Sequence, residues 1–292
     1  MPNIWHGQHL ACHPLIDGVR NLYGYQPSLA AGIFFSILFC LLMISHAVHC
    51  IRRKTWWCTV FIIGCLVEVM GWAARTWSAK CPYSKSAFLM QLSTLIIGED
   101  SPTFFSAGIY LLLGYIIRLL GREFSYFRPN FYFWFFTACD LISLVIQAVG
   151  GGLASSALNA HRDMSVGTNI MIAGIAFQMA STLAFAICMV DCAIRITHSR
   201  KNTIPNGISF LFAAMVLSVL CICTRGIYRV VELSQGWTGY LITHERYFII
   251  LDAVMMALAV GVFAIFHPSL MIPAVNLPSG RSFQELIPII PK

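Results

Sequence analysis

Seven long apolar segments alternate with short polar connections along this chain of 292 residues. A helix needs about 20 mostly apolar residues to cross the hydrocarbon core of a bilayer, and each segment reaches or exceeds that length. The segments cover residues 29–51, 57–77, 87–120, 131–153, 168–192, 207–231 and 247–266. The pattern therefore predicts an all-α polytopic membrane protein, a bundle of seven transmembrane helices.

The third segment leaves two interpretations open. As one helix, residues 87–120 would be about 51 Å long, which exceeds a hydrocarbon core of about 30 Å. If Arg118 marks the cytosolic end, a span of about 20 residues begins near Gly98 and places Glu99 and Asp100 at the outer mouth. The alternative is a strongly tilted helix that carries those acids closer to the middle of the membrane.

Composition supports a membrane protein. Hydrophobic residues make up 58% of the chain and charged residues 11%, whereas soluble domains carry about 25% charged residues. This excludes a water-soluble fold. We expect an extracellular N-terminal segment, residues 1–27, a transmembrane domain, residues 28–268, and a short cytosolic tail, residues 269–292.

The net charge of +7 reflects orientation rather than nucleic-acid binding, because the basic residues are distributed unevenly between alternate connections. One side carries Arg52, Arg53, Lys54, Arg118, Arg122, Arg128, Arg195, Arg200, Lys201, Arg281 and Lys292. The other side carries Arg20, Lys80, Lys85, Arg162 and Arg246. Since basic residues are retained in the cytosol, the pattern predicts an external N-terminus and a cytosolic C-terminus.

Ionisable and amide side chains inside the spans are the candidate functional residues, because a charge at the centre of a membrane helix costs about 2.5–3.5 kcal/mol. They are Glu68 and Arg75 in the second segment, Asp140 and Gln147 in the fourth, Gln178 in the fifth, Arg225, Arg229 and Glu232 in the sixth, and Glu245 and Asp252 in the seventh. With the predicted orientation, most of them fall in the outer half of the bundle.

The stretch RGIYRVVE, residues 225–232, places two arginines and a glutamate on one helix face, within about 60° of arc. Glu245 and Asp252, also seven residues apart, offer partners at similar depth on the last span. We expect the sixth and seventh spans to face each other across a buried ion-pair network beside an outward-opening polar cavity. The alternative is a purely structural role, in which such charged residues fix helix register or reach the lipid headgroups, and that alternative stays open. The acids outnumber the arginines in this layer, which suggests proton coupling as a hypothesis.

Other chemistry has weaker support in the sequence. His46 and His49 lie at the opposite end of the bundle from His244, so we expect no metal site, and no nucleotide-binding loop is present. Most of the eleven cysteines lie inside the spans, where they behave as small apolar residues. Cys12 and Cys81 both fall on the predicted outer side and are candidates for a disulfide bond.

The ordered set of these residues resembles the fungal lipid-translocating exporter family, the RTA-like proteins associated with aminocholesterol resistance. The similarity covers roughly residues 28–268. Its most specific part runs from RGIYRVVE through the Gly-containing loop and His244–Glu245 to Asp252. Further matches are EVMGWAAR from Glu68 to Arg75, SPTFFSAGIY ending at Tyr110, DLISLVIQ from Asp140 to Gln147, and Gln178.

The resemblance implies a fungal multi-pass protein of the plasma membrane, or of an internal membrane, that binds and translocates or exports an amphipathic lipid-like molecule. Sphingoid long-chain bases and sterol-like toxins are the substrate classes linked to the family, with a role in stress and drug resistance. The alternative is a seven-helix receptor or sensor of lipid or membrane stress. We expect no enzymatic activity, no cofactor and no nucleic-acid partner; membrane lipids and the substrate are the expected partners, and the oligomeric state is open.

Overall fold

The computed structural model describes residues 27–81, 100–121, 124–160, 162–199, 206–236 and 239–271. These ranges form helices and connecting turns without a strand, and seven helices are long and apolar enough to cross a membrane. The all-α seven-span fold is therefore confirmed. The predicted terminal segments, residues 1–27 and 269–292, lie almost entirely outside the described residues.

The spans are close to the predicted segments. They are α1 (Leu29–Arg53), α2 (Thr59–Lys80), α4 (Asp100–Leu120), α5 (Pro129–Asn159), α6 (Ser165–Ser199), α7 (Asn206–Ser234), and a last span built from α9 (Glu245–Phe248), the π-helix η5 (Ile249–Val254) and α10 (Met255–Ile265). Short helices η3 (Trp56–Cys58), α8 (Tyr240–Thr243) and α11 (Pro268–Met271) lie next to the spans. α4 has 21 residues within the described ranges, and residues 82–99 lie outside them, so both interpretations of the third segment stay open.

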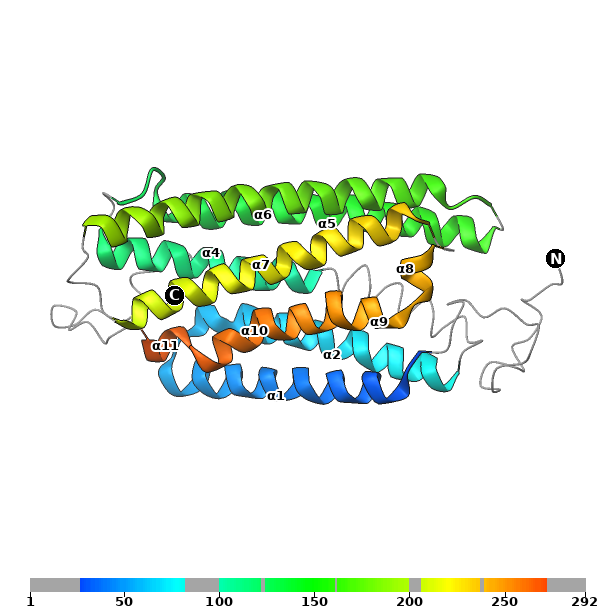
Figure 1. The fold of residues 1–292 in the computed structure, drawn as a ribbon, viewed down its shortest axis with the longest axis horizontal. Helices are drawn as coiled ribbons and strands as arrows, with labels where there is room; N and C mark the ends of the chain where they lie inside the picture. Colours follow the sequence, from blue (N-terminus) through cyan, green and yellow to red (C-terminus); the bar gives the residue numbers. More distant parts are fainter. Residues whose placement is uncertain are drawn as a thin grey trace.

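Successive spans run in opposite directions and pack side by side, as Figure 1 shows. We call the two ends of the bundle the Ser28 end, where α1 begins, and the His267 end, where α10 stops. In Figure 1, α5 and α6 form one layer, α1, α2 and α10 form the opposite one, and α4 and α7 lie between them. In the most apolar stretch of α4, 78% of the residues are buried, against 22% of the residues in that of α1, so α4 is the central helix of the bundle.

Local signals explain how α1 begins and ends. The Ser28 hydroxyl accepts a hydrogen bond from the Ala31 backbone N–H at 3.3 Å, which satisfies one of the unpaired donors of the first turn. At the other end Lys54 adopts a left-handed conformation, φ 53°, and its N–H bonds back to the carbonyls of Cys50 and Ile51. This geometry ends a helix in the manner of a left-handed C-cap.

Two glycines permit close packing of α2 against α4. A Cβ built on Gly64 would lie 2.4 Å from the ring of Phe105, and a Cβ on Gly108 would lie 2.4 Å from the ring of Phe61. Each helix therefore receives a phenylalanine ring from its neighbour at a position without a side chain. Both rings are fully buried in the main apolar cluster of the bundle.

Large apolar side chains cover the outside of the bundle. Ile33 and Phe34 on α1, Val145 on α5 and Ile187 on α6 are 46%, 59%, 64% and 71% exposed. Exposed apolar surface on every outer helix is unfavourable in water, whereas it is the expected surface of a protein surrounded by lipid chains.

Candidate functional site

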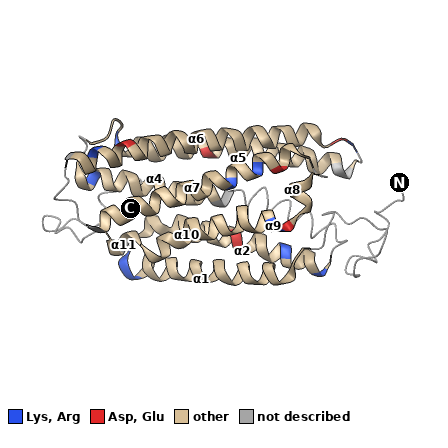
Figure 2. Ribbon diagram, in the orientation of Figure 1, with Lys and Arg blue, Asp and Glu red and all other residues tan. Residues whose placement is uncertain are grey.

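Ionised side chains at membrane depth concentrate in the half of the bundle toward the Ser28 end, where Figure 2 shows acidic and basic residues side by side. Among the described residues, three ion pairs, two of them buried and one partly buried, account for most of them. They link Arg225 to Asp252, Arg229 to Glu232, and Arg75 to Glu245. Burial makes each pair expensive to break, because either charge alone would be left in a poorly solvated position.

The pair between Arg225 and Asp252 joins α7 to the last span, as the sequence predicted. Arg225 donates from Nε to Asp252 Oδ1, and the two side chains are 7% and 8% exposed. Glu68 on α2 also lies within electrostatic range of Arg225. The charge of Arg225 therefore interacts with acids of two neighbouring elements.

Glu232 is bound within its own helix. Arg229 donates to Glu232 Oε2 at 2.5 Å, and the Tyr228 hydroxyl donates to Glu232 Oε1 at 2.8 Å. The spacings of three and four residues are those at which side chains meet on one helix face. This arrangement matches the partner that the sequence assigned to Glu232.

Glu245 was expected to face the arginines of the sixth span, and this expectation is wrong. Its carboxylate accepts from Arg75 Nη2 at 3.0 Å and from the Ser28 backbone N–H at 2.9 and 3.0 Å. It therefore ties α2 and the start of α1 to α9. Arg75 also lies over the ring of Phe248, 4.3 Å from its centroid, a cation–π contact.

The π-helix η5 explains that error. Residues seven apart share a face only in a regular α-helix, but a π-turn contains more residues per turn. Because η5 intervenes between Glu245 and Asp252, the two acids point to different neighbours. Asp252 reaches α7, whereas Glu245 reaches α2 and α1.

Asp140 lies apart from the ion pairs. Its side chain is fully buried, and the Tyr110 hydroxyl donates to Asp140 Oδ2 at 3.0 Å. Asp140 forms no ion pair with any described residue. This carboxyl therefore has a different environment from Glu232, Glu245 and Asp252.

Amide side chains connect three helices near the ion pairs. Gln147 on α5 donates to Gln178 Oε1 on α6 at 3.1 Å, and Gln178 Nε2 donates to Thr103 Oγ1 on α4 at 2.9 Å. Thr182 donates to the backbone carbonyl of Gln178 at 3.0 Å. Thr103 and Thr182 were missed by the sequence analysis, although Thr182 is one helical turn from Gln178 and its spacing was a usable signal.

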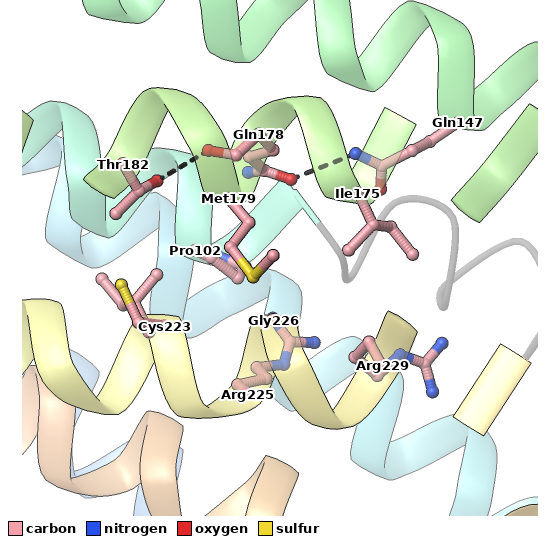
Figure 3. Close-up of a pocket in the computed structure, with 11 residues that line it drawn as sticks. Pro102, Gln147, Ile175, Gln178, Met179, Thr182, Cys223, Arg225, Gly226 and Arg229 are labelled. Carbon is pink, nitrogen blue, oxygen red and sulfur yellow. Dashed lines mark hydrogen bonds between the residues drawn. The ribbon is translucent and has the colours of Figure 1, made fainter. Parts of the chain in front are cut away.

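A crevice opens between α6 and α7 beside these groups, as Figure 3 shows. It holds about 430 Å³ of space, including the space at its open side. Its polar lining consists of Gln147, Gln178, Thr182, Arg225 and Arg229, and its apolar lining of Pro102, Ile175, Met179, Ile222, Cys223 and Gly226. We call it the α6–α7 crevice.

Apolar packing bounds the crevice along the bundle axis. A small cluster of Met171, Ile175 and Leu233 packs toward the Ser28 end, and the main cluster, which includes Ile222 and Phe185, continues toward the His267 end. The partly exposed residues at its opening are Gln178, Met179, Cys223 and Gly226. The opening therefore faces sideways, toward the lipid that would surround α6 and α7.

The predicted site residues thus separate into groups. Four of them line the crevice: Gln147, Gln178, Arg225 and Arg229. Asp252, Glu232 and Glu68 lie behind it, bonded to or close to its arginines. Arg75 and Glu245 form a separate contact at the Ser28 end, and Tyr110 and Asp140 lie deeper in the bundle.

The two cysteines proposed for a disulfide are only partly described. Cys81 follows the last residue of α2 and is disulfide-bonded. Cys12 lies outside the described residues, so its pairing with Cys81 stays a prediction. Nine cysteines of the described ranges are free.

Histidines gather at the His267 end. The rings of His49 and His267 stack with centroids 4.6 Å apart, and His46 lies 5.6 Å from His267. Burial, together with His46 and His49, lowers the pKa of His267 to about 3, so its ring is neutral at physiological pH. Within the described ranges, no three His, Cys, Asp or Glu side chains are arranged to hold a metal ion.

Comparison with known proteins gives consistent matches. The family described as "RTA1 like protein" matches residues 61–274. The sphingoid long-chain base transporter RSB1 of Saccharomyces cerevisiae is 35% identical over 96% of this chain and 80% of its own length. Protein RTA1 of the same species is 30% identical over 92% of this chain and 91% of its own, and protoporphyrin uptake protein 1 is 26% identical over 84% and 91%. No solved structure matches.

Proposed function

The chain belongs to the RTA1-like family of multi-pass membrane proteins, and on that premise we propose that it binds an amphipathic lipid-like molecule and translocates or exports it. Relatives named as transporters support a transport role over catalysis, and we propose no enzymatic activity. A sphingoid long-chain base is the first substrate to test, because one relative is named for its transport.

The α6–α7 crevice is the observation that carries this proposal. It offers amide, hydroxyl and guanidinium groups at membrane depth, and its opening is flanked by apolar residues. A molecule with a polar headgroup and a hydrocarbon chain fits such a place, since the headgroup can leave the bilayer sideways while the chain stays among lipids. Polar groups inside a membrane span usually mark a binding site or a pathway.

The acids behind the crevice suit an ammonium headgroup. Asp252 and Glu232 are bonded to the two arginines of the lining, and Glu68 lies close to Arg225. These acids offer carboxylate oxygens to which the ammonium of a sphingoid base can bond, and its hydroxyls can bond to Gln147 and Gln178.

We propose that the Ser28 end faces the outside and the His267 end the cytosol. The support is the excess of basic residues on connections at the His267 end, such as Arg52, Arg53 and Lys54. In that orientation the crevice lies in the outer half of the membrane. We propose the plasma membrane as the location, with an internal membrane as the alternative.

The alternative function is a receptor or sensor of lipid or membrane stress. Seven spans are also the architecture of such receptors, and a lipid-binding crevice serves detection as well as transport. The two functions differ in one property. A transporter moves its substrate with no other protein present, whereas a sensor needs a partner to produce an effect.

Reconstitution of the full chain in liposomes tests the proposal. We expect a fluorescent long-chain base to cross the membrane faster than in protein-free liposomes, and the rate to fall at least tenfold in Arg225→Gln and Asp252→Asn. Asp191→Asn is the matched control, since Asp191 pairs with Arg195 on α6 with both side chains about 40% exposed. No transfer above protein-free liposomes for the wild type would contradict transport. Unchanged transfer in both Arg225→Gln and Asp252→Asn would contradict the assigned site.

A further inference from the structure

Asp140 is a buried acid with no basic partner among the described residues. Its side chain has no exposed surface, and it forms no ion pair with a described Lys, Arg or His. Oδ2 accepts one hydrogen bond, from Tyr110, and Oδ1 has no hydrogen-bond partner among the described residues. An ionised carboxylate in this position would lose its hydration and gain one hydrogen bond, which is a large penalty.

The groups around Asp140 are neutral on each packed helix. On α4, the titratable group that faces Asp140 is Tyr110. On α6, Thr182 is a neighbour of the Tyr110 hydroxyl. On α5, Ser143 donates to the Asp140 backbone carbonyl at 2.7 Å. The phenolic hydroxyl of Tyr110 is the one ionisable partner in this set. No described cation compensates a negative charge on Asp140.

Hydroxyl groups connect Asp140 to the crevice. Tyr110 bonds to Asp140, and Thr182 lies within reach of the same Tyr110 hydroxyl. Thr182 is part of the polar lining of the α6–α7 crevice. Because a hydroxyl can donate and accept at the same time, Tyr110 and Thr182 provide a path along which a proton can move.

The path is closed in the other direction by aromatic rings. Tyr110, Phe136 and Phe185 contact one another with centroids 4.4 to 5.5 Å apart, and all three are at most 4% exposed. Phe136 precedes Asp140 on α5, and Phe185 follows Thr182 on α6, so both rings lie on the side of the His267 end. Among the described residues, Asp140 therefore communicates with the crevice and is sealed from the opposite end.

We propose that Asp140 is a proton-binding site that exchanges its proton with the α6–α7 crevice through Tyr110 and Thr182. The proton is held while the bundle has the conformation described here, and it leaves when the crevice changes its contents or its solvation. The exchange would couple proton movement to transport, and this coupling rests on the proposed function. The protonation of Asp140 is independent of the proposed function.

Infrared spectroscopy of the purified full chain in lipid tests the protonation. The wild type should show, at neutral pH, the carbonyl band of a protonated carboxylic acid, and Asp140→Asn should lack it. Asp191→Asn, the exposed control on α6, should retain the band. Tyr110→Phe should shift its frequency, because the hydrogen bond to the carboxyl is lost. A spectrum of Asp140→Asn with the same band as the wild type would overturn the proposal.

Transport in liposomes tests the coupling. For exchange of one proton per substrate, a difference of one pH unit should change the steady-state accumulation of a fluorescent long-chain base about tenfold. Asp140→Asn should lose this dependence, and Tyr110→Phe should weaken it. Wild-type accumulation that does not depend on the pH difference would overturn the coupling. The same conclusion would follow if accumulation by Asp140→Asn depended on the pH difference as strongly as in the wild type.

The two measurements separate the possible failures. If the wild type moves no substrate in any gradient, the proposed function fails while the infrared band still decides whether Asp140 holds a proton. If the substrate moves but the band is absent, the proton site fails and the proposed function stands.

Discussion

Two acids of this protein, Asp252 and Asp140, are both buried at membrane depth but are stabilised in different ways. Asp252 is bonded to the guanidinium of Arg225, whereas Asp140 receives one hydroxyl from Tyr110 and faces no described cation. The first arrangement keeps both groups charged and joins α7 to the last span. The second favours a neutral acid that can take up or release a proton. The difference shows that burial alone does not assign a role, because the partner decides the charge state.

The largest expected effect comes from breaking the Arg225 pair. Arg225→Gln leaves Asp252 buried without its main partner, which should lower the free energy of unfolding by about 3–5 kcal/mol. Thermal unfolding of the purified variants in detergent measures this change. The double variant Arg225→Gln with Asp252→Asn should recover part of the loss, since no lone charge remains. Additive losses in the double variant would show that the two groups do not interact.

An intermediate effect is expected for the amide network. Gln178→Leu removes the acceptor of Gln147 and the donor to Thr103, so it should lower the free energy of unfolding by about 1–3 kcal/mol. Transport should fall as well, because Gln178 is part of the crevice lining. Ser181→Ala, three positions further along α6, is a control that leaves both bonds intact. A loss in that control equal to the loss in Gln178→Leu would contradict the assigned bonds.

The smallest change at neutral pH is expected for Asp140→Asn, because an amide has nearly the shape of a neutral acid. The free energy of unfolding should change by about 1 kcal/mol or less. If Asp140 holds a proton in the folded state and releases it on unfolding, wild-type stability falls as pH rises, by at most about 1.4 kcal/mol per pH unit. The variant should lose this slope. Unfolding series between pH 5 and pH 8 measure it, and equal slopes would contradict a bound proton.

The sequence was sufficient for the architecture because membrane spans depend on length and apolar composition, which are read directly from the chain. It also identified Arg225 and Asp252 as partners, since both lie deep in adjacent spans. It failed for Glu245, because the π-helix between Glu245 and Asp252 has no signature in the residue pattern. The sequence likewise did not predict that Asp140 and Asp252 have different partners. The difference depends on which helices pack against each acid, and a single sequence does not contain that information.

Gly64 and Gly108 have a consequence for how this sequence can vary. Each glycine is in contact with a ring of the opposite helix, Phe105 and Phe61 respectively, with no room for another carbon. A larger residue at either glycine is tolerated only together with a smaller one at its ring partner. Across related chains, substitutions at these two positions should therefore occur in matched pairs, small with large, so that the combined volume of each pair is conserved.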